Sequence, residues 1–222
     1  MNAMKTTTVG IIGAGEVGSE VARAMISLGY QVVIANSRGP ESLQSLVRSL
    51  GPSARGATAA QAAAVGDFVV IAVPLKLINN MPVDELAGKI VLDTNNYMIW
   101  RDGNYPAIDS GEKTVYELRQ EQLPTSRVVQ AFTHIQAPRI MSAGLPAGSR
   151  RRIAFPISSN FPEAVAFVAE LFDQLGYDTV DNSPLSEAWR TAPGQPAWRN
   201  LNHQNSEELV ENISKAQRHV LS

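Results

Sequence analysis

Three glycines near the start of the chain have the spacing of a phosphate-binding turn. The residues Gly13-Ala14-Gly15-Glu16-Val17-Gly18 fit G-x-G-x-x-G. Gly13 permits a tight turn, Gly15 lets the backbone approach a pyrophosphate, and Gly18 lets the next helix pack closely. The pyrophosphate would lie on the free N–H groups at the positive end of that helix. An ordinary glycine-rich turn is the alternative. The residues expected to contact the dinucleotide are Gly13, Ala14, Gly15, Glu16 and Val17.

The residues after the second predicted strand indicate which dinucleotide would bind. NAD-binding units usually carry an acidic residue about 20 residues past the glycines, but this chain has Asn36-Ser37-Arg38 there. Arg38 supplies a permanently charged donor fork that suits a 2′-phosphate, and Ser37 supplies a hydroxyl. Ser42 and nearby backbone amides could add to this site, because a helix is expected to begin near Pro40. We therefore expect NADP; the alternative is that Arg38 is a solvated loop residue.

Apolar runs and helical patterns alternate along the chain, which predicts an α/β protein of the Rossmann type. We expect a doubly wound, mostly parallel sheet with a small C-terminal extension. An NADP-binding domain should span 1–158, and 159–222 should form a small C-terminal α/β region that completes the site. The expected strands are 9–12, 31–35, 54–58, 67–74, 89–93, 127–132, 153–158 and 177–180. The expected helices are 17–28, 41–50, 59–65, 75–77, 83–87, 112–122, 162–175 and one that begins at Asn205.

Ligands of such sheets lie beyond the carboxyl ends of the strands, and this rule selects three more loops. Pro74 and Pro138 could shape loops against cofactor rings, although prolines end many ordinary strands. Asn95 and Asn96 could hold the nicotinamide ribose or carboxamide, with turn formation as the alternative. His134 could orient a ring by bonding its carbonyl, or could be a structural histidine. The candidate residues of these loops are Ala72, Val73, Pro74, Asn95, Asn96, His134 and Ala137.

Composition excludes several classes of chemistry. The 222 residues carry a formal net charge of −2 and include no cysteine, which excludes disulfides, thiolate catalysis and cysteine-bound metals. The three histidines are scattered without metal-ligand spacing, so we expect no metal. No apolar run approaches the length of a membrane span, and no long basic run suggests nucleic acid. A cytoplasmic protein that acts on small molecules is expected.

Several of these motifs together resemble the NADP reductases that use the deazaflavin coenzyme F-420. The resemblance runs from about Thr8 to about Trp198. Its more specific parts are the Ser37-Arg38 pair and the loop Asp93-Thr94-Asn95-Asn96-Tyr97. The glycine turn, Val70-Ile71-Ala72-Val73-Pro74 and the segment 129–138 also match. The resemblance implies reversible hydride transfer between nicotinamide C4 and the deazaflavin ring, with NADP and the deazaflavin as the cofactors. It also implies a C-terminal region that covers the second cofactor.

Two other functions remain open. One is an NADPH-dependent reductase of a flavin, an imine or a carbonyl compound, although related dehydrogenases need a long helical domain for which too little chain follows Ser158. The other is an NADP-binding module without turnover. Hydride transfer between two cofactors requires little acid–base chemistry from the protein, so we expect no obligatory catalytic residue, His134 included.

The last part of the chain suggests how the protein could assemble and bind a second ring. The final helix carries an apolar stripe, Leu209, Ile213, Ala216 and Val220, which predicts a homodimer unless the stripe packs on its own sheet. Trp189 and Trp198 could cap a cofactor ring, with core packing as the alternative. The run 150–152 is three arginines that could attract an acidic tail, with a solvated charge run as the alternative. The stretch 183–205 is expected to be irregular.

Overall fold

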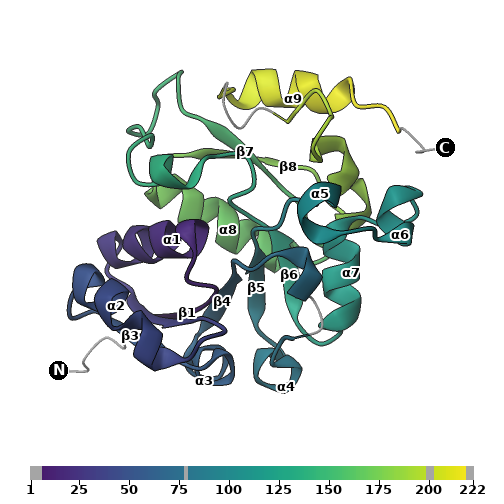
Figure 1. The fold of residues 1–222 in the computed structure, drawn as a ribbon. Helices are drawn as coiled ribbons and strands as arrows, with labels where there is room; N and C mark the ends of the chain where they lie inside the picture. The colour runs from purple at the N-terminus through teal and green to yellow at the C-terminus, as the bar shows by residue number, and fades with distance from the viewer. Residues whose placement is uncertain (1–6, 78–79, 199–202, 219–222) are drawn as a thin grey trace.

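A six-stranded parallel sheet forms the centre of the molecule, with the strand order β3-β2-β1-β4-β5-β6 (Figure 1). The computed structural model describes residues 7–77, 80–198 and 203–218. The strands are β1 (Thr8–Ile12), β2 (Gln31–Ala35), β3 (Ala54–Ala57), β4 (Phe68–Ile71), β5 (Ile90–Asp93) and β6 (Arg127–Gln130). The order reverses direction between β1 and β4, which creates the crevice where doubly wound sheets bind their ligands. The expected α/β Rossmann-type fold is confirmed.

Helices cover both faces of this sheet because the strands are apolar on both sides. One face packs against α1 (Glu16–Ser27), α2 (Gln44–Leu50) and α8 (Pro162–Gln174). The other packs against α3 (Ala59–Val65), α4 (Val83–Leu86) and α7 (Val115–Gln122). Within β1, Val9 and Ile11 join the first layer, and Ile12 joins the second. Alternation along the strand therefore divides the buried residues between two cores.

A second, two-stranded parallel sheet of β7 (Ala154–Ile157) and β8 (Asp178–Asp181) follows the main sheet. Helix α8 connects its strands and shares a core with α1 and β1. The backbone N–H of Gln130 donates to the Ser158 carbonyl at 3.0 Å, which links β6 to the end of β7. The boundary expected at residue 158 lies between β7 and β8, which pair with each other.

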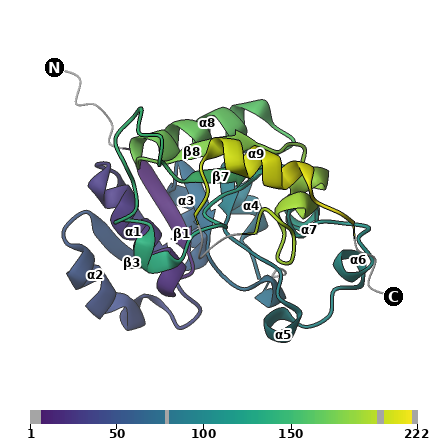
Figure 2. The same ribbon diagram turned by 90° about the horizontal axis from the view of Figure 1, so that it is seen from above.

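The final helix, α9 (Ser206–Ser214), lies over the two-stranded sheet (Figure 2). Asn205 and Glu208 form the expected reciprocal cap at its start, with bonds of 3.0 Å in both directions. The prediction of an apolar helical stripe is wrong beyond Ser214, because the helix ends at that residue. Ala216 follows the helix, and Val220 lies outside the described residues. Leu209 is buried against Ala154 and Ala197. Its packing is internal, so this stripe does not support a dimer, which stays a prediction.

Several boundaries differ from the sequence expectations. Helix α7 begins at Val115 rather than at 112, because Thr114 and Glu117 cap each other reciprocally. Strand β6 ends at Gln130 rather than at 132, because Phe132 takes a left-handed φ of 57° that turns the chain. Four further short elements are η1 (Pro40–Leu43), η2 (Leu75–Leu77), α5 (Ile99–Asp102) and α6 (Pro106–Asp109). The last two were not expected. The stretch expected to be irregular contains a 3₁₀ helix, η4 (Leu185–Thr191).

Candidate functional site

The glycine turn between β1 and α1 is held tightly against the end of β4. Gly13 has a φ of 115°, and its N–H donates to the Ala35 carbonyl at 2.9 Å. A Cβ on Gly13 would collide with the carbonyl oxygen of Ala72, and one on Gly18 would collide with the carbonyl oxygen of Gly13. These two glycines are therefore required by the fold itself.

Gly15 differs, because nothing in the protein requires a glycine there. Its φ of −78° and ψ of −164° suit any residue, and a Cβ would meet no atom within 4 Å. The residue is exposed at the N-cap of the twelve-residue helix α1, which has no side-chain cap. Free N–H groups at the positive end of a helix suit an anion. Because Gly15 has no side chain, the space above these N–H groups is open, and a pyrophosphate fits directly on the backbone. Ala14, Glu16 and Val17 complete this turn.

The loop after β2 presents a cation beside the glycine turn. Asn36 and Ser42 bind each other, with 2.9 Å from Asn36 Nδ2 to Ser42 Oγ, and Asn36 Oδ1 accepts from the backbone N–H of Arg38 at 3.0 Å. These bonds shape the loop and leave Ser37 and Arg38 exposed. Within the described part of the chain, the Arg38 guanidinium forms no ion pair. This arrangement fits a 2′-phosphate on an adenosine ribose.

Ala72, Val73 and Pro74 follow β4 and stand next to the glycine turn. The strand ends at Ile71 rather than at Pro74, but the Ala72 N–H still donates to the Ile12 carbonyl at 2.8 Å. The carbonyl of Ala72 lies against Gly13. The structure therefore brings together the two loops on either side of the point where the strand order reverses.

Asn95 and Asn96 belong to a hydrogen-bonded loop at the end of β5. Asn95 is buried, and Asp93 Oδ1 accepts from both its backbone N–H (2.9 Å) and its Nδ2 (2.6 Å). Asn96 Nδ2 donates to the Thr133 carbonyl at 2.9 Å, which ties the β5 loop to the β6 loop. Both amides thus have structural partners, and Asn96 is the more open of the two.

His134 is buried and uncharged. Its exposed fraction is 2%, its ring contacts Trp198 edge-on at 5.0 Å between centroids, and its Nδ1 is 2.8 Å from Thr133 Oγ1. Burial lowers the pKa of His134 to about 3, although the nearby Thr191 backbone slightly opposes this shift. Ala137, in the 3₁₀ turn η3 (Ala137–Arg139), is also buried and packs towards α1. A neutral imidazole cannot deliver a proton as an imidazolium at neutral pH.

A polar cluster that sequence reasoning missed lies between β5, β6 and α7. Arg119 Nε is 2.8 Å from Asp93 Oδ2, and neither side chain has exposed surface. The Tyr116 hydroxyl donates to the Asn95 carbonyl at 2.7 Å. Gln130 Nε2 donates to Thr133 Oγ1 and to Thr191 Oγ1, each at 3.2 Å. Two signals could have revealed the cluster: Arg119 lies one helical turn after the buried Val115, and Gln130 is a polar residue in an apolar strand.

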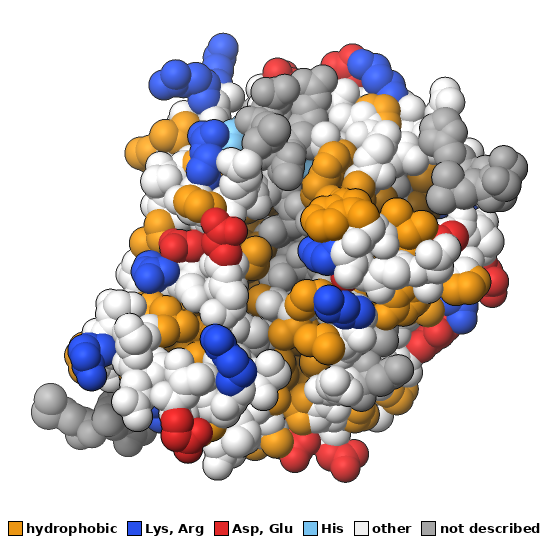
Figure 3. All heavy atoms as spheres, viewed as in Figure 1, with side chains coloured by type: hydrophobic (Ala, Val, Ile, Leu, Met, Phe, Trp, Pro, Cys, Tyr) orange, Lys and Arg blue, Asp and Glu red, His pale blue; other side chains and the backbone are white. Residues whose placement is uncertain are grey.

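A cavity of about 520 Å³ opens beside this cluster. Figure 3 shows hydrophobic side chains gathered over the region of α5, where Trp100 is 81% exposed. The cavity includes Asn95 and Asn96 but neither the glycine turn nor the loop of Arg38. Its walls come from the β5–α5 loop, α5, residues 108–117, Gln130, the region 186–195 and Arg218. It could therefore hold a second molecule beside the dinucleotide crevice.

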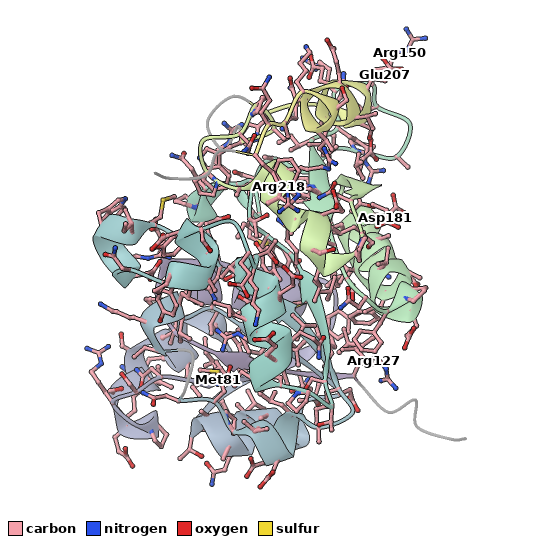
Figure 4. All side chains as sticks on the ribbon, turned by 90° about the vertical axis from the view of Figure 1, so that its right-hand side faces the viewer. Met81, Arg127, Arg150, Asp181, Glu207 and Arg218 are labelled. Atoms are coloured by element: carbon pink, nitrogen blue, oxygen red, sulfur yellow. The ribbon has the colours of Figure 1, made fainter. Side chains whose placement is uncertain are left out.

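The three arginines at 150–152 do not act together. Arg152 is buried, with its NH2 group 2.8 Å from Asp173 Oδ1, so it stabilises the C-terminal region. Arg150 projects away from the body of the molecule (Figure 4), whereas the exposed Arg218 folds back over the Trp189 ring and donates to the Gly111 carbonyl at 3.0 Å. In the parts of the chain that the structure describes, no group of three or more His, Cys, Asp or Glu residues could hold a metal ion. None of the described helices is long and apolar enough to cross a membrane.

Comparison with known proteins gives the family. Residues 8–97 match the family described as NADP oxidoreductase, coenzyme F420-dependent. A hypothetical protein of Sinorhizobium meliloti, SMa0349, has a similar structure with a TM-score of 0.73 and 30% identity, over 90% of this chain and 96% of that one. The chain belongs to this family of NADP oxidoreductases.

Other similar proteins agree with the family to different extents. A protein of Arthrobacter sp. FB24, provisionally named an F420-dependent NADP reductase, is 25% identical with a TM-score of 0.71, over 82% of this chain and 87% of that one. An imine reductase of Myxococcus stipitatus shares the fold at 19% identity and a TM-score of 0.56, over 83% of this chain and 56% of that one. The protein YjhV of Escherichia coli K12 is 35% identical over 54 residues, which cover 24% of this chain and 39% of YjhV.

Proposed function

We propose that this protein transfers a hydride between NADP(H) and a deazaflavin acceptor of the coenzyme F-420 type. The observation that carries the NADP part is the open backbone at Gly15 beside the exposed guanidinium of Arg38, which forms no ion pair with any described residue. NADP needs both features, because its pyrophosphate would lie on the open backbone and its 2′-phosphate would pair with the guanidinium. Family membership supports oxidoreduction, and the name of the Arthrobacter protein supports the deazaflavin.

NADPH, when bound, supplies a hydride from nicotinamide C4. The acceptor ring gains that hydride and one proton from solvent, and NADP⁺ is released, so charge and atoms balance. The contribution of the chain is to bind and align the two rings. The glycine turn and Arg38 would hold the phosphates, and the loops at Ala72–Pro74 and Asn95–Asn96 would border the nicotinamide.

The second candidate is an NADPH-dependent reductase of a flavin, an imine or a carbonyl compound. Reduction of a carbonyl or an imine requires a proton donor close to the reacting carbon. His134 is neutral and lies outside the residues that line the cavity. His134 is therefore not the donor for an acceptor in the cavity, whereas a deazaflavin or a flavin can take its proton from solvent. An NADP-binding module without turnover is the third candidate.

One experiment separates the three candidates. Purified protein is mixed with NADPH and, in turn, with the deazaflavin coenzyme, a flavin, a cyclic imine and a ketone, and NADPH oxidation is followed by absorbance. We expect oxidation with the deazaflavin at a rate well above that with the other acceptors. Oxidation with the imine or the ketone alone would reject the proposal. NADPH binding without oxidation by any acceptor would support the binding module.

A further inference from the structure

Two residues that line the cavity beside the polar cluster each have a buried polar atom without a hydrogen-bond partner among the described residues. Gln130 is 1% exposed, and its Oε1 accepts no hydrogen bond among the described residues. Trp189 Nε1 is likewise buried and donates none within the same part of the chain. Both residues line the cavity. Unpaired buried polar groups are rare because each carries a desolvation cost.

The hydrogen bonds around Gln130 decide which end of its amide is unpaired. Thr191 donates its single hydroxyl hydrogen to the Ala188 carbonyl at 3.0 Å, so towards Gln130 it can only accept. The amide end that faces Thr191 is therefore the nitrogen, and the oxygen faces elsewhere. Tyr116 also lines the cavity, but it donates its hydroxyl hydrogen to the Asn95 carbonyl. Neither Thr191 nor Tyr116 can therefore supply a hydrogen to Gln130 Oε1.

The two tryptophans on the cavity wall differ in what they offer to a ligand. The guanidinium groups of Arg190 and Arg218 lie over the Trp189 ring, at 4.6 and 4.8 Å from its centroid. Trp189 therefore offers its N–H rather than a free face. Trp100 is 81% exposed at the cavity wall, and its face is open. A planar ring could stack on Trp100.

The helix that carries Trp100 is fixed in place, although it has only four residues. Arg101 donates to the Asn96 carbonyl at 2.6 Å, and Asp102 accepts from the backbone N–H of Met98 at 3.1 Å. Arg101 and Asp102 also pair with each other at 2.7 Å. An exposed tryptophan on an anchored support is suited to contact a ligand rather than to cover a core.

We propose that this cavity is the acceptor site and that it selects a planar heteroaromatic ring with a cyclic imide or lactam edge. Gln130 Oε1 accepts from the ring N–H, Trp189 Nε1 donates to the adjacent carbonyl, and Trp100 stacks on the ring. This inference rests on the proposed function, because it assigns a site to the acceptor. It adds Gln130 and Trp189 as the residues that determine specificity.

The test uses a matched pair of ligands that needs no change in the protein. Lumiflavin has a free imide N–H, and 3-methyllumiflavin carries a methyl group there. Binding of each to the protein with saturating NADP⁺ is measured by calorimetry. We expect the methylated ring to bind at least about tenfold more weakly, because it leaves the Gln130 oxygen unpaired. Equal affinities would overturn the assignment of Gln130.

Two variants test the other contacts. Trp189→Phe keeps an aromatic ring but removes the N–H, and Trp100→Ala removes an exposed ring without disturbing a core. Each should weaken lumiflavin binding by about five- to tenfold and leave NADPH affinity unchanged. Val210→Ala, an exposed apolar residue on α9, is the matched control. If neither variant weakens binding, the cavity is not the acceptor site.

Failure of this inference can be distinguished from failure of the proposed function. Oxidation of NADPH by the deazaflavin, combined with equal binding of the two lumiflavins, would overturn the cavity assignment and retain the function. Selective binding of lumiflavin without NADPH oxidation by any acceptor would retain the cavity as a ring-binding site and reject the hydride transfer.

Discussion

Asp93 and Arg119 form an ion pair whose side chains have no exposed surface, with 2.8 Å between Oδ2 and Nε. The other oxygen of Asp93 accepts from the backbone and the side chain of Asn95. This carboxylate therefore joins α7 to the loop after β5, where the dinucleotide crevice and the cavity meet. Its loss should affect both stability and the shape of that loop.

We predict that Asp93→Asn lowers the free energy of unfolding by about 3–5 kcal/mol, because it breaks the fully buried ion pair between Asp93 and Arg119. Urea denaturation of both proteins gives the value. Lys215→Ala breaks the exposed pair with Glu211, at 2.6 Å, and should cost far less stability, because solvent screens that pair. If the two variants lost equal stability, the buried pair would have no special role.

We predict that Arg38→Ala weakens NADPH binding by about 1.5–3 kcal/mol through the loss of a charge-assisted bond to phosphate. NADH affinity should not change, because NADH has no 2′-phosphate. Fluorescence titration with both nucleotides measures the difference. Arg48→Ala, another exposed arginine on the adjacent helix α2, serves as the control. Wild-type protein that binds NADH as tightly as NADPH would contradict the assignment.

We predict opposite outcomes at two glycines of the same turn. Gly15→Val should fold normally, because its Cβ meets no protein atom, and should lose NADPH binding. Gly13→Ala should lose at least about 2 kcal/mol of stability, since its φ of 115° and the Ala72 carbonyl both exclude a side chain. Circular dichroism melting and NADPH titration distinguish them. Unchanged NADPH affinity in Gly15→Val would mean that the loop is a structural turn that does not bind the pyrophosphate.

We predict that His134 makes stability depend on pH. Burial lowers its pKa to about 3, against about 6.5 in an unfolded chain, so the unfolded state takes up the proton first as the pH falls. The contribution is complete above about pH 6.5 and decreases towards pH 3, by up to about 1.4 kcal/mol per pH unit. Urea titrations at several pH values should show that the free energy of unfolding depends less steeply on pH in His134→Asn than in the wild type. His203 is unchanged in both proteins, so its own titration cancels.

We predict that His134→Asn slows single-turnover hydride transfer by about fivefold, the effect of one lost orienting hydrogen bond. A general acid would contribute about 10²–10⁴-fold. Stopped-flow mixing of the NADPH complex with the acceptor measures the rate. A thousandfold decrease with intact NADPH affinity would identify His134 as a proton donor and favour reduction of an imine or a carbonyl compound.

The first βαβ unit could be predicted because its signals are local. The apolar runs, the glycine spacing and the helical period each act within a few residues, and β2 has the expected bounds of 31–35. The start of α7 was expected three residues too early, at 112, although Thr114 and Glu117 have the spacing of a reciprocal cap. The exposed position of Arg38 follows from the same local pattern.

The cavity could not be predicted, because its parts meet only through tertiary contacts. Helices α5 and α6 have four residues each, too few to show a period. They are held by bonds such as that from the Tyr97 hydroxyl to Asp109 Oδ1, at 2.6 Å. Gln130 and Thr191 are 61 residues apart in the sequence. No local pattern shows that Gln130 lies beside Thr191 and lacks a partner for its oxygen.

The short helices α5 and α6 have a consequence for how proteins of this kind could diversify. They extend from the carboxyl edge of the sheet and contribute no strand to it (Figure 1). Insertions or replacements there would alter one wall of the cavity while β1, α1 and β2 kept their packing. New acceptors could therefore be acquired during evolution without rebuilding the half of the protein that holds the nucleotide. Loops tolerate such changes better than the strands that they connect.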